Sequence, residues 1–228
     1  MQKFNTKGIV LARTNYGEAD RIITFLTPDQ GKVKVIAKGV RKAKSKLAGG
    51  IELFSVSDIG VLQGKGDVST LVSSRLVTHY GQIVKDINRT NLAYQLIKNL
   101  DKATEDKLET EYFILFKQAF EALDDESVSI ELIEAWFGAQ LLKLAGHAPN
   151  LQTDKTGAKL QAGQKYDFNF DSMNFETGKD YHTDQIKFLR LLFSANPPVS
   201  LQKINNAKGL TNSISNLISL LYQAFIIH

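Results

Sequence analysis

A run of cations that contains no acidic residue is the feature of this sequence with the clearest chemical meaning. Between residues 32 and 46 there are seven lysines and arginines and no aspartate or glutamate. Such a run favours a polyanion ligand, because each phosphate that a cation neutralises releases condensed counterions. The residues expected to contact phosphate are Lys34, Lys38, Arg41, Lys42, Lys44 and Lys46, with Arg13 and Arg21 at the margin.

The residues around this run refine the kind of ligand. Gly39, Gly49 and Gly50 would let a loop approach a nucleic-acid backbone closely, and Ser45 adds a hydroxyl group. Tyr16 is the best candidate for stacking on a base, because the other aromatic residues of this region fit a protein core. We therefore expect binding led by phosphate and tolerant of base sequence. A solvated basic loop without a ligand is the alternative interpretation.

The excess of positive charge is confined to the N-terminal third. Residues 1–82 hold 13 lysines and arginines against 6 acidic residues, whereas the whole chain has a net charge of only +4. An N-terminal module with such an excess of positive charge is a candidate polyanion binder.

Five strands are predicted in this basic third. Runs of β-branched and alternating residues, separated by turn residues, place them at 8–12, 21–27, 32–37, 53–62 and 69–77. Five short strands favour a small closed barrel, and the one longer connection, residues 39–50, lies where an OB-type Greek-key barrel has it. An SH3-like barrel is the rival structure. The basic run would then occupy the third strand and the loop that follows it.

After about residue 82 the apolar residues recur with helical spacing. Helices are predicted over 88–100, 108–123, 133–144, 184–193 and 210–227. Residues 150–182 interrupt them with a mixture of polar, glycine and aromatic residues, and 166–170 alternate like a short strand. The sequence thus predicts an α+β chain with a five-stranded OB-type β-barrel at 1–80. A mainly α-helical domain follows at 81–228, with a small insertion at about 150–182.

Several classes of function lack their signature in this sequence. There is no cysteine, so disulfides and thiolate chemistry are excluded. Gly64-Lys65-Gly66 lacks the Ser or Thr that a phosphate-binding loop needs, and the acidic run at 167–171 breaks the calcium-loop pattern at Ser172. We expect no catalytic residues, no cofactor and no metal, which argues against a nucleotide-dependent enzyme. No apolar stretch is long enough to span a membrane and 1–10 does not look like a signal peptide, so a cytoplasmic protein is expected.

Motifs in order along the chain resemble the RecO family of recombination mediators. Residues 17–23 read GEADRII, 37–45 read AKGVRKAKS, 47–55 read LAGGIELFS and 146–151 read GHAPNL. Each motif is weak alone, but their order and spacing together are specific.

The resemblance implies an N-terminal OB fold, a helical C-terminal domain and no catalytic residues. It also implies binding to single- and double-stranded DNA, annealing of complementary strands, and help in loading RecA onto DNA coated with single-strand-binding protein (SSB). The implied partners are RecR and the C-terminal tail of SSB, in the bacterial cytoplasm and associated with the nucleoid. An RNA-binding OB-fold protein is the alternative, and the sequence leaves the oligomeric state open.

The chain departs from the family in one place. Many members carry a four-cysteine zinc site after the segment that matches 146–151, and here Thr153 and Thr156 stand at matching positions. A thiolate zinc site is therefore impossible. We expect the aromatic residues of 166–175 to hold the insertion together by packing instead.

Overall fold

The computed structural model describes residues 2–64, 66–103 and 109–226. The chain divides into two compact units, residues 1–97 with 104–124 and residues 98–103 with 125–228. The first unit therefore contains two helical segments in addition to the strands. The domain boundary at residue 80 stays a prediction, because a compact unit need not coincide with a domain.

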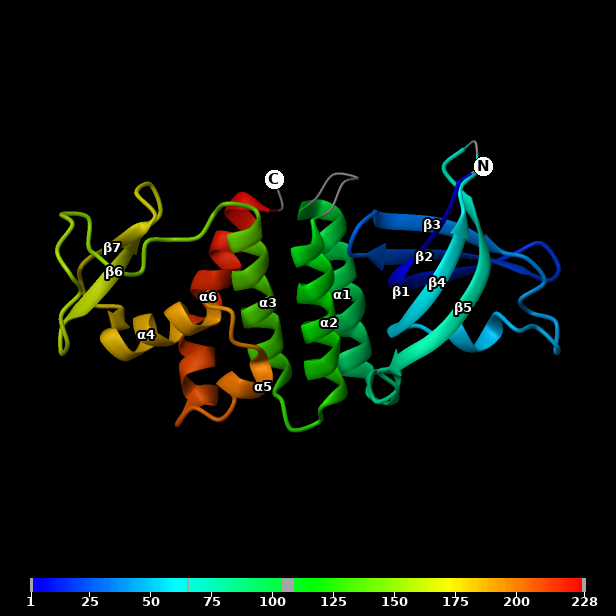
Figure 1. Ribbon diagram of the computed structural model, residues 1–228. Coiled ribbons are helices and arrows are strands. Elements are labelled where there is room, and N and C mark those ends of the chain that lie inside the picture. Colours follow the sequence, from blue (N-terminus) through cyan, green and yellow to red (C-terminus); the bar gives the residue numbers. More distant parts are fainter. Residues whose placement is uncertain (1, 65, 104–108, 227–228) are drawn as a thin grey trace. The chain divides into compact units, whose positions relative to one another are not determined.

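Five strands form a closed barrel in the first unit (Figure 1). They are β1 (Lys3–Tyr16), β2 (Asp20–Thr27), β3 (Gly31–Ala37), β4 (Ser55–Leu62) and β5 (Ser69–His79). Their order is β1-β2-β3-β5-β4, and β4 pairs back onto β1. β3 and β5 run parallel, with Val35 opposite Ser69 and Ile36 opposite Thr70. This arrangement confirms the OB-type barrel and excludes the SH3-like alternative.

Alternating residues of the strands fill the barrel. Val10, Ile23, Phe25 and Val35 belong to one buried cluster, as expected where every second side chain of a strand points inward. Gly8 lies against the ring of Phe25, and a Cβ atom at residue 8 would come within 2.7 Å of that ring. A glycine is therefore required for the ring to pack against this part of β1.

Strand β1 is longer than the predicted strand at 8–12. Its first half pairs with β4 and its second half with β2, and the register shifts between Val10 and Ala12. The additional residues at both ends, 3–7 and 13–16, are mostly polar and exposed or half-buried. A search for apolar runs misses such ends, because backbone pairing rather than burial of side chains defines them.

Aromatic rings attach two helices to the barrel. These are α1 (Ile87–Ala103) and α2 (Thr110–Asp124), and α2 packs on β1 and β2. The ring of Phe54 meets Tyr94 of α1 at 5.4 Å and Phe120 of α2 at 5.3 Å, both edge to face. Phe54 is completely buried and its φ is +56°, a strained value for a bulky residue. Its amide donates to Val10 and its carbonyl accepts from Tyr80, which ties the junction to β1 and to the end of β5.

The second unit contains four helices within residues 125–226: α3 (Ile130–Leu144), α4 (Thr183–Leu192), α5 (Pro198–Leu201) and α6 (Ala207–Phe225). Trp136 and Phe137 on α3 are each 1% exposed, so they are core residues and do not line an open groove. Trp136 Nε1 donates to the carbonyl of Asn196 at 2.9 Å, and Lys143 Nζ donates to that of Phe193 at 3.0 Å. These bonds hold α3 to the chain that follows α4.

The predicted helices correspond to α1, α2, α3, α4 and α6, with ends that differ by a few residues. Leu108 and Ile227, the predicted ends of two of them, lie outside the described residues, as does Lys65 of the Gly64-Lys65-Gly66 segment. The short helix α5 was not predicted, because one turn is too short to show a helical period. Among the described helices, none is both long and apolar enough to cross a membrane.

The insertion is a small three-stranded sheet of β6 (Lys165–Asn169), β7 (Asn174–Thr177) and β8 (Tyr181–His182). Phe175 is completely buried and its ring packs edge to face on Phe168 and Tyr181. Tyr166 is also buried, whereas Phe170 is 41% exposed. Aromatic packing therefore accounts for only part of what holds this segment.

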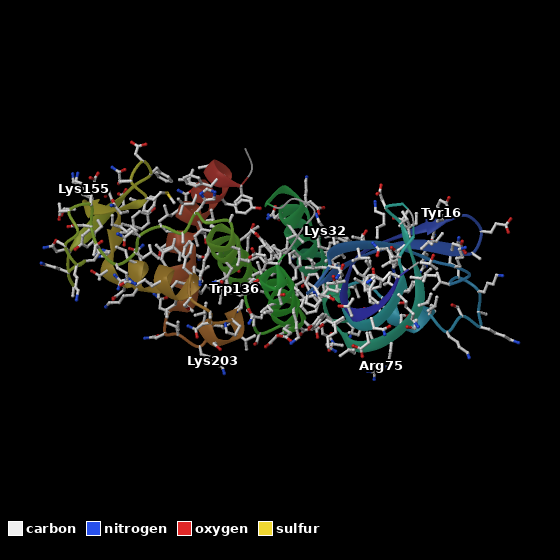
Figure 2. The ribbon with its side chains drawn as sticks, turned by 45° about the horizontal axis from the view of Figure 1, so that its top comes forward. Tyr16, Lys32, Arg75, Trp136, Lys155 and Lys203 are labelled. Carbon is white, nitrogen blue, oxygen red and sulfur yellow. The ribbon has the colours of Figure 1, made fainter. Side chains whose placement is uncertain are left out.

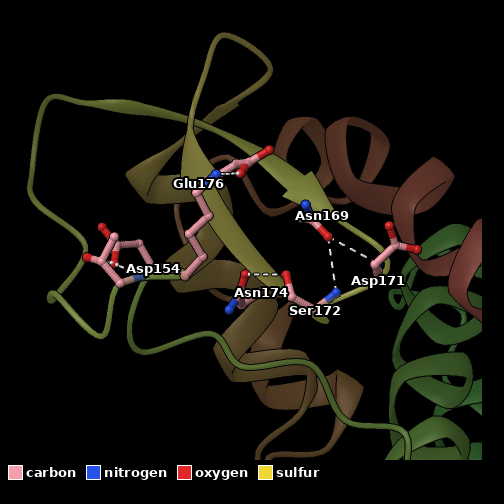
Figure 3. A network of polar contacts seen from close by, with 8 residues as sticks. Asp154, Asn169, Asp171, Ser172, Asn174 and Glu176 are labelled. Atoms are coloured by element: carbon pink, nitrogen blue, oxygen red, sulfur yellow. Dashed lines mark hydrogen bonds and ion pairs between the residues drawn. The ribbon is translucent and has the colours of Figure 1, made fainter.

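Carboxylates and amides hold the turns of the insertion. Asp167 accepts hydrogen bonds from the amides of Lys179 at 2.6 Å and Asp180 at 3.0 Å. Asp154 accepts in the same way from the amides of Thr156 and Ala158. The turn between β6 and β7 is closed by Asn169, and an ion pair of Lys155 with Glu176 lies nearby (Figure 3). The Thr156 hydroxyl, which donates to Asp154 Oδ1 at 2.6 Å, is the main group that lowers the pKa of Asp154, and the backbone amides add to the effect. The amides of Lys179 and Asp180 lower the pKa of Asp167, because these hydrogen bonds stabilise the charged carboxylate.

Acid is expected to loosen the turn that Asp167 holds. Its pKa in the folded chain lies below the ordinary 3.8, so the stabilisation is present above that value and is lost as the pH falls through the folded pKa. NMR shifts of the Lys179 and Asp180 amides, followed from pH 6 to pH 3, would move toward unstructured values. In the Asp167→Asn variant, whose acceptor does not titrate, that movement should be absent. An identical movement in the variant would contradict the assignment.

Candidate nucleic-acid interface

Lys34 projects from the outer side of β3. Its neighbour Val35 lies in the barrel core opposite Ile23, and successive side chains of a strand alternate between faces. Lys34 is accordingly exposed, opposite Thr24 of β2. The β2–β3 surface is the one that OB folds commonly present to oligonucleotides.

The segment that follows β3, residues 38–47, is here called the basic loop. Two apolar side chains anchor it: Val40 is buried in the barrel core, and Leu47 packs against the same core. At its start the amide of Gly39 donates to Asp20 Oδ1 at 2.7 Å, and the amide of Arg41 donates to the carbonyl of Ala19 at 2.9 Å. Gly39 has a φ of +64°, which glycine adopts without strain. The loop is thus fixed to the turn between β1 and β2.

The cations of the basic loop point into solvent. In the described chain, no acidic side chain forms an ion pair with any cation of the loop or with Lys34. Among the described residues, the guanidinium of Arg41 donates only to the carbonyl of Gly17, at 3.4 Å. The exposed members are Lys34, Lys38, Arg41, Lys42, Lys44 and Lys46, and we call these six residues the basic surface.

Arg13 and Arg21, the two arginines expected at the margin of the site, are less exposed than the six residues of the basic surface. Arg13 is opposite Ile23 and so shares the core-facing side of the sheet. Its Nη1 is 2.7 Å from Glu52 Oε2, and its side chain is 27% exposed. Arg21 is half-buried, and its Nε donates to Asn15 Oδ1 at 3.0 Å. The charge of Arg13 is therefore largely compensated, whereas Arg21 keeps its charge beside the β1–β2 turn.

Lys32 does not join the basic surface, although it belongs to the same run of sequence. It is half-buried opposite Leu26, five residues before the end of β3, and it has a partner within the protein. Figure 2 shows Lys32 and Tyr16 at opposite ends of the strands. At about 3.3 Å per residue, Lys32 lies about 17 Å from the end of β3, where the basic loop begins.

Two features of this region were not apparent in the sequence. Lys7 and Arg75 both bind Asp58, at 2.9 and 2.5 Å, and their hydrogen bonds lower its pKa. The three residues are neighbours only in the register of β1, β4 and β5, and two cations share one anion there. Gly50 was expected to admit a ligand, but a Cβ atom there would come within 2.6 Å of Ser74. Gly50 therefore allows the short turn at residues 48–50 to pack on β5.

The described residues contain no group of three or more His, Cys, Asp or Glu side chains arranged to hold a metal ion. The region presents exposed cations on a loop that is anchored to the barrel. Exposed cations can bind phosphate groups by charge neutralisation, with strength that falls as salt rises.

Comparison with known proteins gives this surface its context. Residues 1–80 match the family model described as Recombination protein O N terminal. DNA repair protein RecO of Dehalococcoides mccartyi is 31% identical over 199 residues, covering 83% of this chain and 78% of that protein. DNA repair protein RecO of Desulfatibacillum aliphaticivorans is 34% identical over 154 residues, covering 66% and 60% of the two chains.

A third relative, DNA repair protein RecO of Listeria monocytogenes serotype 4b, is 28% identical over 198 residues, covering 82% of this chain and 76% of its own. The matched N-terminal segment ends with the closed barrel, and the alignments with the relatives continue into the helical unit. This similarity over most of both chains, together with the OB-type barrel, shows that the chain belongs to the RecO family of DNA repair proteins.

Proposed function

We propose that this protein is a recombinational repair mediator that binds single- and double-stranded DNA through the basic surface. Its work is to anneal complementary strands and to help load RecA onto SSB-coated single strands, with RecR and the C-terminal tail of SSB as partners. It acts in the bacterial cytoplasm at the nucleoid, and it catalyses no bond chemistry. Lys34, Lys38, Arg41, Lys42, Lys44 and Lys46 contact phosphate in this proposal, with Arg21 and Arg13 at the margin.

The observation that carries the proposal is the set of six exposed cations that have no acidic partner among the described residues. Folding leaves these charges unneutralised, so a polyanion that meets them displaces only water and loosely held ions. The membership of the chain in a family of DNA repair proteins makes DNA the polyanion of choice.

Annealing follows from the same physical property. Two complementary strands repel each other through their phosphates, and a cationic surface that binds both lowers that repulsion. Contacts to phosphate leave the base edges free to pair, whereas contacts to base edges would block pairing. A surface of lysines and arginines on an anchored loop satisfies this condition.

A strand-annealing assay on SSB-coated oligonucleotides tests the proposal. The wild-type protein is expected to accelerate duplex formation, and the triple variant Arg41→Glu, Lys42→Glu, Lys44→Glu is expected to lose most of that acceleration. Circular dichroism of the variant provides the control for folding, since all three residues are exposed. Equal annealing by the two proteins would refute the assignment of the basic surface. RNA of matched sequence, used as competitor, separates DNA binding from the RNA-binding alternative.

A further inference from the structure

We propose that Tyr16 stacks on an unpaired base of the strand that the basic surface holds. This inference rests on the proposed function and adds to it a residue that distinguishes single-stranded DNA from duplex. The contact gives the site a preference for unpaired strands that phosphate neutralisation alone does not supply.

The exposure of Tyr16 is the first observation. It is the last residue of β1, opposite Asp20, and 55% of its surface is exposed. The other aromatic residues of the barrel are different: Phe25 and Phe54 are completely buried, and Phe4 packs against the barrel core. In the described chain, Tyr16 has no ring contact and no side-chain hydrogen bond. More than half of its surface is therefore accessible to a ligand.

The attachment of the Tyr16 turn to the basic loop is the second observation. Arg41 bonds this turn twice, by its amide to the carbonyl of Ala19 and by its guanidinium to that of Gly17. Asp20 accepts from the amide of Gly39 on the other side of the turn. A strand whose phosphates lie on Arg41 and its neighbours is thereby brought beside one exposed ring.

The local backbone keeps the ring accessible. Gly17 has a φ of +54°, and apart from its two chain neighbours no atom lies within 4 Å of where its Cβ would be. The chain therefore turns directly after Tyr16 at a residue that has no side chain. Arg21, which is bonded to Asn15, adds a cation at the base of the same hairpin.

The chemistry of stacking selects the ligand. Every base has an aromatic face, so a tyrosine ring accepts any of them, and each such contact contributes about 1–3 kcal/mol. In a duplex both faces of an internal base are already covered by neighbouring base pairs. Tyr16 thus contributes to the binding of single strands and contributes little to the binding of intact duplex.

The test compares three substitutions at one position with three DNA ligands. Tyr16→Ala removes the ring, whereas Tyr16→Phe and Tyr16→Trp keep an aromatic face. The ligands are a single-stranded oligonucleotide, the same oligonucleotide with abasic sites in its centre, and a duplex of the same length. Affinities are measured by fluorescence anisotropy at one low salt concentration.

Tyr16→Ala is expected to weaken single-strand binding by about 5- to 150-fold, the equivalent of one stacked base. Binding to the abasic strand and to the duplex should change by less than about twofold, and both aromatic substitutions should restore single-strand affinity. An equal loss on all three ligands would overturn the inference, because the ring would then only support the loop. No loss on any ligand would overturn it as well.

Failure of this inference and failure of the proposed function give different results. Tyr16→Ala leaves the six cations intact, and the triple charge reversal of the basic loop leaves Tyr16 intact. If the charge reversal abolishes DNA binding while Tyr16→Ala binds single strands like wild type, only the stacking contact is wrong. If the charge reversal leaves DNA binding unchanged, the basic surface is not the DNA-binding site and the proposed function fails there.

Discussion

Reversing the charges of Arg41, Lys42 and Lys44 together is expected to lower the affinity for single-stranded DNA by about two orders of magnitude at low salt. If about five residues contact phosphate on one strand, the logarithm of affinity should fall with the logarithm of salt with a slope of roughly −3.5. Losing three contacts reduces that slope to roughly −1.4. The measurement is a titration at several salt concentrations, repeated with oligonucleotides of different sequence. The loss should be the same for all sequences.

The matched control for this prediction reverses three exposed lysines of the insertion, Lys159, Lys165 and Lys179. Both triple variants change the net charge of the chain by the same amount, so the comparison isolates where the charge lies. The salt slope of the control variant should differ from that of the wild type by no more than about 0.7, the equivalent of one phosphate contact. If both variants lost affinity equally, the net charge of the chain would explain the effect. The basic surface would then not be the DNA-binding site.

Replacing Phe54 by alanine is expected to lower the free energy of unfolding of the first unit by about 3–5 kcal/mol. The residue is completely buried, and its ring contacts Tyr94 and Phe120 on two helices. A cavity at this point separates the barrel from both helices. Hydrogen exchange of buried barrel amides, such as that of Phe25, measures the loss in this unit. The single tryptophan, Trp136, lies in the other unit, so its fluorescence follows that unit instead.

An exposed phenylalanine provides the comparison for Phe54. Phe170 is 41% exposed in the insertion, and Phe170→Ala should change stability by less than about 1 kcal/mol. A loss below that value for Phe54→Ala would mean that the junction relaxes around the cavity. Alanine keeps a Cβ atom, so most of the backbone strain at residue 54 remains in the variant. The measured difference in stability therefore reports the loss of the ring.

The barrel was predictable because its strands alternate in a simple way. Val33, Val35 and Ala37 face inward, while Lys34 faces outward, and the sequence shows this period directly. The polar ends of β1 and the single turn of α5 carry no such period, so they were missed. The sheet of the insertion was predicted only at one strand, because short strands closed by asparagine and aspartate turns resemble loops in sequence.

The candidate site was predictable in its charges and less so in its geometry. The lysines of the basic loop are close in sequence, and they stay close because one short loop carries them. The pairing of Arg13 with Glu52 joins residues 39 positions apart, and only the register of the barrel brings them together. The separation of Lys32 from the loop likewise follows from its place near the start of β3 and not from its sequence neighbours.

The anchoring of the basic loop by Val40 and Leu47 has a thermodynamic consequence for binding. Because these side chains are packed before any ligand arrives, little apolar area remains to be buried on association, and the heat-capacity change of binding should be small. A loop that need not fold first also presents no slow step to an incoming strand. Under the proposed function, capture and release of DNA would then depend mainly on ion concentration, and contacts of this kind would be quick to break.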